Sequence, residues 1–129
     1  MKIKTFDHIA INVVDIKESE KFYSEVLGLK VADRIPNGDN VLVYIKINEN
    51  SAIELFDHQK KIDYFEHPAS ASGTAHIALS VTGIEDWYAH LKKHDVVFTL
   101  DLCALDHLGK KVLLFKDPNG VVIELSEDL

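Results

Sequence analysis

The chain has 129 residues, of which 47% are hydrophobic, and its 14 Lys and Arg against 21 Asp and Glu give a formal net charge of −7. This composition is ordinary for a globular domain and argues against disorder, and the acidic balance disfavours nucleic acid as a partner. No apolar run approaches the ~20 residues of a membrane span and no signal peptide is recognisable, so we expect a cytoplasmic protein without a membrane partner.

Alternating apolar residues, separated by turn signals, predict a βαβββ module over about residues 1–58. The pattern predicts, in chain order, a strand at about 3–14, a helix at 16–27 and strands at about 29–34, 41–47 and 51–57. Asp15 is the expected N-cap of the helix, and Gly28 is the residue expected to end it.

The pattern is interrupted after this module. Pro68 and the small residues at 69–73 predict a linker over about 59–73, with a helical turn at 60–65. The same order then returns in a second module over about 74–129. The pattern predicts a strand at about 75–81, a helix near 84–93, and strands near 96–100, 111–115 and 120–126. We therefore expect a single α+β domain made of two βαβββ modules.

Each predicted module places a histidine in its first strand and a glutamate in its last. His8 and His76 are 76 − 8 = 68 residues apart, and Glu54 and Glu124 are 124 − 54 = 70 apart, as duplication of one unit would produce. A carboxylate in the middle of an apolar strand costs several kcal/mol to desolvate unless it is paired. The two histidines are the natural partners.

Two His and two Glu form a ligand set that suits Zn, Ni, Co, Mn or Fe(II) better than Ca or Cu. If the last strand of each module lies beside its first, His8 neighbours Glu54 and His76 neighbours Glu124. Two such pairs would supply four of the six positions of an octahedral ion and leave two for water or substrate. We therefore expect one divalent metal per site, held by these four residues.

The other reactive side chains indicate less chemistry. Cys103 is the only cysteine, which excludes an internal disulfide, and we interpret it as a small hydrophobe in or near the core. His107 lies in a Gly-flanked loop and is either a cavity residue or an exposed one. The histidines interpreted as solvated surface residues are His58, His67, His90 and His94. No glycine-rich dinucleotide motif, P-loop or serine-hydrolase motif is present.

Four stretches of the chain carry a resemblance to a known family. They are His8–Val13, Ser19–Leu29, Ala75–Val81 and Phe115–Leu125. Together they resemble the vicinal oxygen chelate superfamily, which includes glyoxalase I, fosfomycin resistance thiol transferases, methylmalonyl-CoA epimerases, extradiol dioxygenases and bleomycin resistance proteins. The resemblance covers nearly the whole chain. It implies paired βαβββ modules that form a cupped mixed sheet around a divalent metal, and it favours a homodimer.

Within that superfamily, the full His-Glu-His-Glu set resembles glyoxalase I. This implies a metal-dependent lyase of the lactoylglutathione lyase type, acting on the hemithioacetal of a 2-oxoaldehyde and a thiol. One of the two ligand glutamates, Glu124 or Glu54, would take the C1 proton, and the metal would stabilise the enediolate. Proton return at C2 would give the 2-hydroxyacyl thioester.

One position departs from the glyoxalase I pattern. Bacterial glyoxalase I usually carries Arg four residues after the first His, where it grips a glutathione carboxylate, whereas this chain has Asn12. Asn brings no charge, so a bidentate carboxylate clamp is lost. Another thiol, or a different oxyanion substrate, is therefore open.

Two alternatives remain at the level of the sequence. One is another metal-dependent enzyme on the same scaffold, either a thiol transferase or an extradiol dioxygenase. The other is a metal-free drug-binding resistance module, which would suit the acidic surface and the missing Arg. The residues leave open which metal is bound and whether a site lies within one chain or across a dimer.

Overall fold

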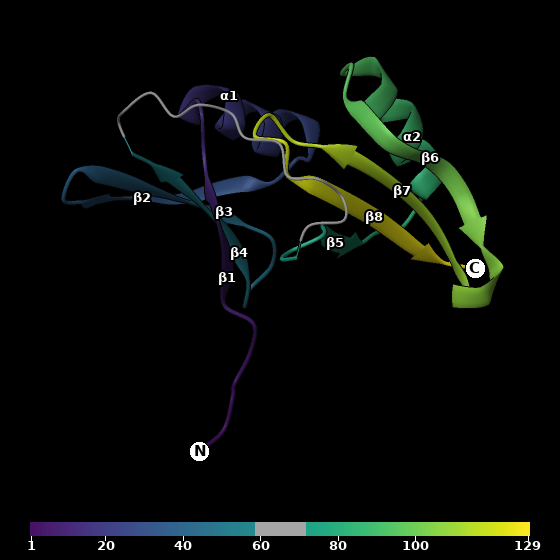
Figure 1. Ribbon diagram of the computed structural model, residues 1–129, viewed down its shortest axis with the longest axis horizontal. Coiled ribbons are helices and arrows are strands. Elements are labelled where there is room, and N and C mark those ends of the chain that lie inside the picture. The colour runs from purple at the N-terminus through teal and green to yellow at the C-terminus, as the bar shows by residue number, and fades with distance from the viewer. Residues whose placement is uncertain (59–71) are drawn as a thin grey trace. The chain divides into compact units, whose positions relative to one another are not determined.

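The computed structural model of the protein describes residues 1–58 and 72–129. The chain divides into two compact units, Met1–Tyr64 and Phe65–Leu129, drawn in purple to teal and in teal to yellow in Figure 1. The predicted linker at 59–73 and its helical turn at 60–65 lie outside the described residues, apart from a bend at 72–73.

The first unit has the predicted βαβββ order. Its elements are β1 (His8–Asn12), α1 (Ile16–Lys21) with a π-helical continuation (Phe22–Val26), β2 (Lys30–Asn37), β3 (Asn40–Lys46) and β4 (Ala52–Asp57). The strands form one sheet in the order β1-β4-β3-β2, in which β1 and β4 are parallel and the other pairs antiparallel. The strand predicted at 3–14 is longer than β1, which begins only at His8 and ends at Asn12.

The second unit repeats this topology. Its elements are β5 (Ile77–Ser80), α2 (Ile84–Lys93), β6 (Val97–Leu105), a 3-10 turn (Asp106–Leu108), β7 (Lys110–Lys116) and β8 (Val122–Asp128). The sheet order is β5-β8-β7-β6, with β5 parallel to β8. In both units the last strand therefore lies beside the first, as expected. The helix prediction at 84–93 is confirmed, whereas β6 extends beyond the strand predicted at 96–100.

Local chemistry explains where the first helix begins and ends. The Asp15 carboxylate accepts hydrogen bonds from the backbone N–H groups of Lys17 (2.8 Å) and Glu18 (3.0 Å), which confirms it as the N-cap. Gly28 ends the helical segment at φ +66°, in the left-handed region that favours glycine.

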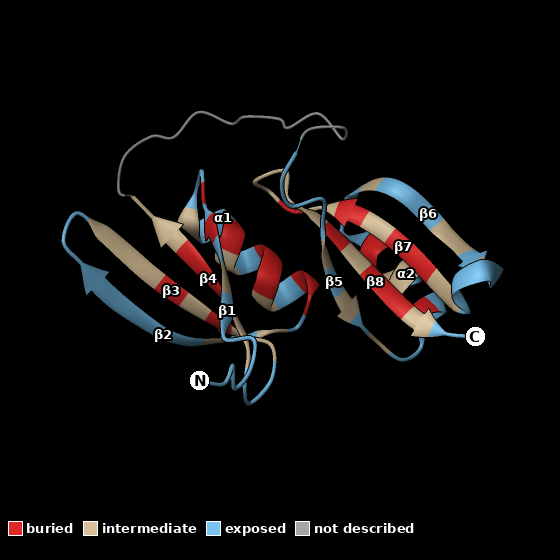
Figure 2. Cartoon of the chain, turned by 60° about the horizontal axis from the view of Figure 1, so that its bottom comes forward, coloured by how far each residue is buried: buried red, intermediate tan, exposed pale blue. Residues whose placement is uncertain are grey.

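Each sheet has a buried face and a more open one. In the first unit the fully buried side chains of β3 and β4 are Val43, Ile45, Ile53 and Leu55, and in the second those of β7 and β8 are Leu113, Phe115, Ile123 and Leu125. Figure 2 shows this buried stripe along the central strands and along the inner face of α1. Since successive side chains alternate across a strand, residues between these positions lie on the open face.

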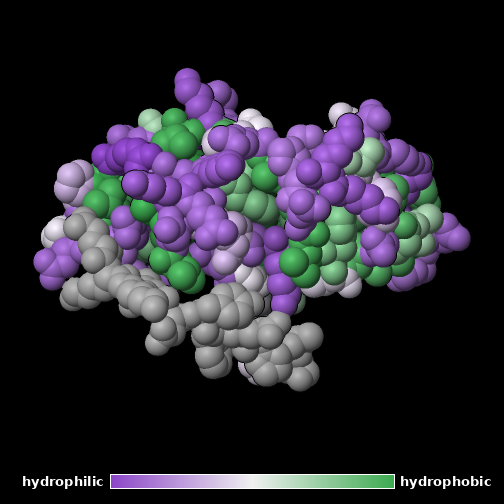
Figure 3. Space-filling model, turned by 90° about the horizontal axis from the view of Figure 1, so that it is seen from above, coloured by the Kyte–Doolittle hydropathy of each residue, from purple (hydrophilic) through white to green (hydrophobic). Residues whose placement is uncertain are grey.

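Hydrophilic side chains cover much of the face seen in Figure 3, with apolar side chains between them. Among the described residues, no helix is long and apolar enough to cross a membrane.

Candidate functional site

The structure brings His8 and Glu54 together within the first unit. His8 is the first residue of β1, and Glu54 lies in the middle of β4. In the parallel register His8 is opposite Ala52 and Ala10 is opposite Glu54, so the two side chains point to the same face. His8 Nε2 lies 3.4 Å from Glu54 Oε2.

The second unit brings His76 and Glu124 together in the same way. Ala78 is opposite Glu124 in the parallel pair β5–β8, and His76 Nε2 lies 3.4 Å from Glu124 Oε2. His76 lies immediately before β5 rather than inside a strand, which corrects the strand placement predicted for it. The predicted pairing of each histidine with the glutamate of its own module is confirmed.

Glu54 is the more buried of the two carboxylates. Its side chain is 5% exposed, against 19% for Glu124. The hydroxyl of Tyr44, directly opposite on β3, donates a hydrogen bond to Glu54 Oε1. This bond to the carboxylate, together with burial and the negative charges of Glu54 and Asp7, raises the pKa of Tyr44 to about 12. Tyr44 therefore remains a donor to Glu54 at neutral pH.

His8 is oriented by a second carboxylate. Asp7 Oδ2 lies 2.6 Å from His8 Nδ1. A proton on Nδ1, donated to Asp7, leaves the lone pair of Nε2 directed towards Glu54. This is the arrangement in which an outer carboxylate sets the tautomer of a metal-ligating histidine.

The geometry of each pair fits a shared metal ion. Two ligand atoms about 2.1 Å from one ion, at angles of about 90–110°, lie about 3.0–3.4 Å apart. The 3.4 Å between nitrogen and oxygen in both pairs agrees with this spacing and is long for a hydrogen bond. Within the described residues no three His, Cys, Asp or Glu side chains gather into a metal-binding group, so each unit supplies two of the four predicted ligands.

A polar cluster lies on the same face of the first sheet, towards the other end of β1 and β4. His58 Nε2 lies 2.8 Å from Asn12 Oδ1, and His58 Nδ1 lies 2.9 Å from Asn40 Oδ1. An imidazolium ring donates to both amide oxygens, whereas a neutral ring requires one amide to turn its NH₂ inward. His58 is thus held between two asparagines, and its interpretation as a solvated surface histidine is corrected.

The remaining predicted residues lie apart from these pairs. Cys103 is half-buried in β6, and His107 is exposed in the 3-10 turn. His90 lies on α2 and His94 is the residue that caps its C-terminus, with ring centroids separated by 4.6 Å. His67 lies outside the described residues.

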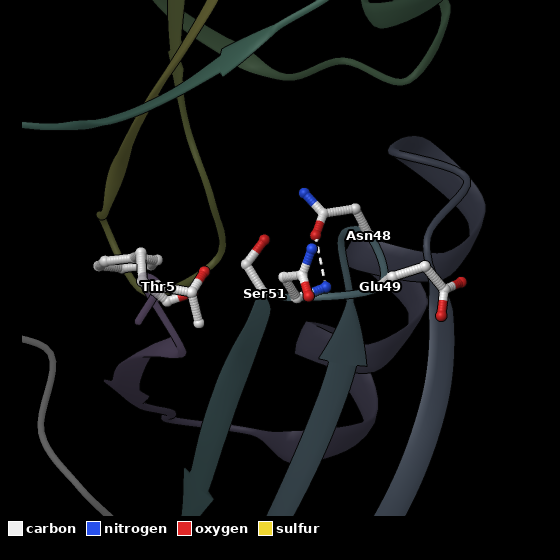
Figure 4. A pocket seen from close by; sticks show the side chains of 6 residues that line it. Thr5, Asn48, Glu49 and Ser51 are labelled. Carbon is white, nitrogen blue, oxygen red and sulfur yellow. Dashed lines mark hydrogen bonds between the residues drawn. The ribbon is translucent and has the colours of Figure 1, made fainter. Parts of the chain in front are cut away.

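A shallow hollow of about 550 Å³ opens in the first unit beside the turn before β4. The residues that line it are Thr5, Phe6, Asn48, Glu49, Asn50 and Ser51. In Figure 4 the Glu49 carboxylate lies away from Thr5 and Ser51, and the dashed bond joins the Asn48 side chain to the backbone N–H of Asn50 at 2.8 Å. Neither His8 nor Glu54 lines this hollow, so the hollow is separate from the predicted metal ligands of the first unit.

This fold has counterparts among known proteins. The chain belongs to the Glyoxalase/Bleomycin resistance protein/Dioxygenase superfamily, whose family model matches residues 5–125. Among curated proteins it is 27% identical over 132 residues to the mitochondrial methylmalonyl-CoA epimerase of Mus musculus, covering 98% of this chain and 74% of that one. It is 28% identical to a protein of Synechocystis sp. named probable lactoylglutathione lyase, covering 92% and 91% of the two chains.

Solved structures show the same fold. The trypanothione-dependent glyoxalase I of Leishmania major superposes with a TM-score of 0.75 and 27% identity, covering 97% of this chain and 87% of that one. A glyoxalase family protein from Enterococcus faecalis superposes with a TM-score of 0.79 and 29% identity, covering 98% and 100%. These similarities support both the α+β fold and the resemblance inferred from the sequence.

Proposed function

We propose that this chain is a metal-dependent lyase of the glyoxalase I type, which converts the hemithioacetal of a 2-oxoaldehyde and a thiol into a 2-hydroxyacyl thioester. The observation that carries the proposal is the matched His–Glu pair in each module, with Nε2 and Oε2 separated by 3.4 Å in both. His8, Glu54, His76 and Glu124 would together hold one divalent ion, of Ni, Zn, Co, Mn or Fe. The modules that complete one site would belong to one chain or to the two chains of a homodimer.

The metal, the glutamates and the histidines would have different roles in this reaction. When bound, a divalent ion supplies Lewis-acid polarisation of the two adjacent substrate oxygens. One carboxylate, Glu124 or Glu54, takes the proton from C1 and returns it at C2. His8 lies at the start of β1 and His76 immediately before β5, where the adjoining strands would hold the ligand atoms in place.

The arrangement is harder to reconcile with a metal-free binding module. A carboxylate that is 5% exposed costs several kcal/mol to desolvate, and binding a neutral or cationic drug does not require a histidine nitrogen 3.4 Å from it. A thiol transferase or an extradiol dioxygenase would also use a metal held on this scaffold. Those two activities are therefore outcomes of the substrate screen below.

The thiol part of the substrate need not be glutathione. Asn12, His58 and Asn40 present amide and imidazole groups on the open face of the first sheet. This cluster takes the place of the arginine expected at position 12, and it carries no permanent charge. We therefore propose that a small thiol other than glutathione is an equal candidate for the physiological cosubstrate.

A second candidate is an epimerase acting on a 2-substituted acyl thioester. It is favoured by the similarity to methylmalonyl-CoA epimerases of Mus musculus and Homo sapiens, at 27% and 28% identity over 98% and 94% of this chain. The chemistry needs the same parts, because a carboxylate removes a proton next to a carbonyl and returns it. Exchange of the substrate C2 hydrogen in deuterated water, without thioester formation from a hemithioacetal, would identify this activity.

The first experiment is calorimetric titration of the chelator-stripped protein with Ni²⁺ and Zn²⁺. We expect saturable binding by the wild type. Glu54→Gln should lower the metal affinity by more than about 10–100-fold, the loss that is typical when a residue hydrogen-bonded to a ligand is removed. Glu49→Gln, in the exposed turn before β4, is the matched control and should bind as the wild type does. Absence of metal binding in the wild type would exclude the proposed function.

The second experiment is turnover of hemithioacetals of methylglyoxal with several thiols, followed by absorbance of the thioester product. We expect Glu124→Gln to lower kcat about 100- to 10,000-fold, the usual contribution of a general base, while the protein stays folded. A Glu124→Gln enzyme with the wild-type rate would rule out a proton-transfer role for Glu124. Oxygen uptake with a catechol, or thiol addition to an epoxide, would assign the alternative activities.

A further inference from the structure

The two halves of the proposed metal site differ in what surrounds the ligands. Repeat-equivalent positions are 70 residues apart at the glutamates, so Tyr44 corresponds to Leu114. The strand register gives the same correspondence, because Tyr44 is directly opposite Glu54 and Leu114 directly opposite Glu124. A hydroxyl donor thus faces the first glutamate, and an aliphatic side chain faces the second.

Tyr44 contacts both members of the first pair. Its hydroxyl donates to Glu54 Oε1, and its ring lies edge-on to His8 with centroids 5.9 Å apart and planes at 83°. The bond holds Oε1 at the hydroxyl, and Oε2 of Glu54 is the oxygen that lies 3.4 Å from His8 Nε2. The bond therefore selects one carboxylate oxygen and one orientation for a ligand.

The second pair has no such support. Glu124 accepts no side-chain hydrogen bond from the described residues, and its only close polar contact among them is His76 Nε2 at 3.4 Å. The residue before His76 is Ala75, whereas the residue before His8 is Asp7, which contacts the ring nitrogen of His8. A carboxylate without a fixed hydrogen bond retains more rotamer freedom, which must be lost when it binds an ion.

We infer that Tyr44 is a positioning residue that fixes the Glu54 carboxylate, so that the His8–Glu54 pair is the more strongly pre-organised half of the metal site. This role rests on the proposed function, and it makes the first module the better-supported half of the site. Tyr44 touches no reacting atom; it acts through Glu54. Asp7 supports the same half, but its side chain is 84% exposed, so solvent weakens its effect.

The test compares Tyr44→Phe with the wild type by calorimetric titration of the chelator-stripped full chain with Zn²⁺. Removing the hydroxyl leaves the ring in place and frees Glu54 Oε1, and we expect the Kd for Zn²⁺ to rise about 10–100-fold. The matched control is Tyr88→Phe, which also removes a hydroxyl bonded to a carboxylate, here Asp101 Oδ1 at 2.9 Å. Tyr88 and Asp101 lie on α2 and β6, which carry no member of either pair. The Kd of Tyr88→Phe should equal that of the wild type.

A spectroscopic measurement separates positioning from a merely structural role. In the Co²⁺-loaded protein, Tyr44→Phe should shift the visible ligand-field bands, because Glu54 is free to bind through both oxygens, and Tyr88→Phe should not. Zn²⁺ should raise the melting temperature of the wild-type protein. The substitution Tyr44→Phe should change the melting temperature of the metal-free protein by less than this increase.

Three results would overturn the inference. An unchanged Zn²⁺ affinity and Co²⁺ spectrum in Tyr44→Phe would show that Tyr44 does not position Glu54, although the proposed function would stand. A loss of stability in the metal-free variant that accounts for the whole loss of affinity would make Tyr44 a packing residue only. A wild-type protein that binds no metal would remove both the inference and the proposed function.

Discussion

Glu54 is a buried carboxylate whose cost in stability is offset by its neighbours. Its neighbours Ile53 and Leu55 are fully buried in the core, and Glu54 itself, on the opposite face, is 4% exposed. The desolvation of its carboxylate is offset by the Tyr44 hydroxyl and by its position beside His8. The sequence was sufficient to predict that Glu54 needs a partner, and it supplied His8 as that partner.

The contacts of Tyr44 and His58 could not be predicted from the sequence. Tyr44 is separated from Glu54 by ten positions in the chain, and it meets the carboxylate only because β3 and β4 pair in one particular register. His58 and Asn12 are separated by 46 positions and meet because β1 adds to the far side of β4. Register is fixed by which face of each strand is buried, so these contacts follow from packing rather than from local sequence.

Asn12 permits a test of substrate preference at the residue scale. Asn12→Arg places a permanent positive charge at the position where the resemblance to bacterial glyoxalase I implies an arginine that binds a carboxylate. A charged hydrogen bond is stronger than a neutral one by roughly 1 kcal/mol. We expect the KM for the glutathione hemithioacetal to fall about five-fold relative to that for an uncharged thiol. Steady-state kinetics with both substrates would measure the ratio.

Asn12→Gln is the control for this substitution, because it also disturbs the bond to His58 but adds no charge. It should leave the preference between the two hemithioacetals unchanged. An Asn12→Arg enzyme with the wild-type preference would mean that this end of the sheet does not contact the thiol part of the substrate.

At the scale of elements, the two helices are capped at their N-termini by different means. Asp15 caps α1 from within the same segment, which is why the sequence predicts its start correctly. The helix then continues as a π-helical segment in which the N–H of Leu27 donates to the carbonyl of Phe22 at 3.2 Å. The continuation to about residue 27 was predicted, but its π geometry was not, because periodicity alone does not distinguish the two.

The second helix is capped by another strand. Both oxygens of the Glu127 carboxylate, on β8, accept hydrogen bonds from the start of α2, at 2.7 Å from the N–H of Gly83 and 3.1 Å from that of Ile84. Gly83 itself provides no side chain to cap the helix. This long-range cap satisfies two of the four free N–H groups at the helix start and places a negative charge at the positive end of the helix dipole.

Glu127→Gln is expected to lower the free energy of unfolding by about 1 kcal/mol, because it removes the charge and one acceptor oxygen from this cap. Denaturation by urea, followed by circular dichroism, would measure the change. The neighbouring substitution Asp128→Asn is the control: Asp128 pairs with Lys110 at the surface, at 2.5 Å, and exposed pairs contribute little to stability. Equal losses in the two variants would contradict the capping role of Glu127.

At the scale of the whole molecule, the chain uses one packing scheme twice. The buried positions Ile53 and Leu55 on β4 correspond to Ile123 and Leu125 on β8, each 70 residues later, like the two glutamates between them. In each module these side chains pack on the inner face of the sheet, while the glutamate side chain lies on the other face. The two modules therefore share both their buried positions and the position of the glutamate.

Leu55→Ala and Leu125→Ala form a matched pair for testing this equivalence. Each removes a side chain that is no more than 1% exposed, and each should lower the free energy of unfolding by about 2–5 kcal/mol. Urea denaturation of both variants and the wild type would give the two losses. A loss below that range in only one variant would show that the two cores are not equally packed.

The sequence by itself determined the two modules, their order of elements, the four candidate ligands and the pairing of each histidine with the glutamate of its own module. It did so because hydrophobic alternation, turn residues and repeat spacing are local properties of the chain. Only the tertiary structure decided that Tyr44 contacts Glu54, that Asp7 contacts His8 through the ring nitrogen opposite to Glu54, and that His58 lies between Asn12 and Asn40. Those contacts join different strands or depend on side-chain rotamers, and both are set by the register and burial of the folded sheet.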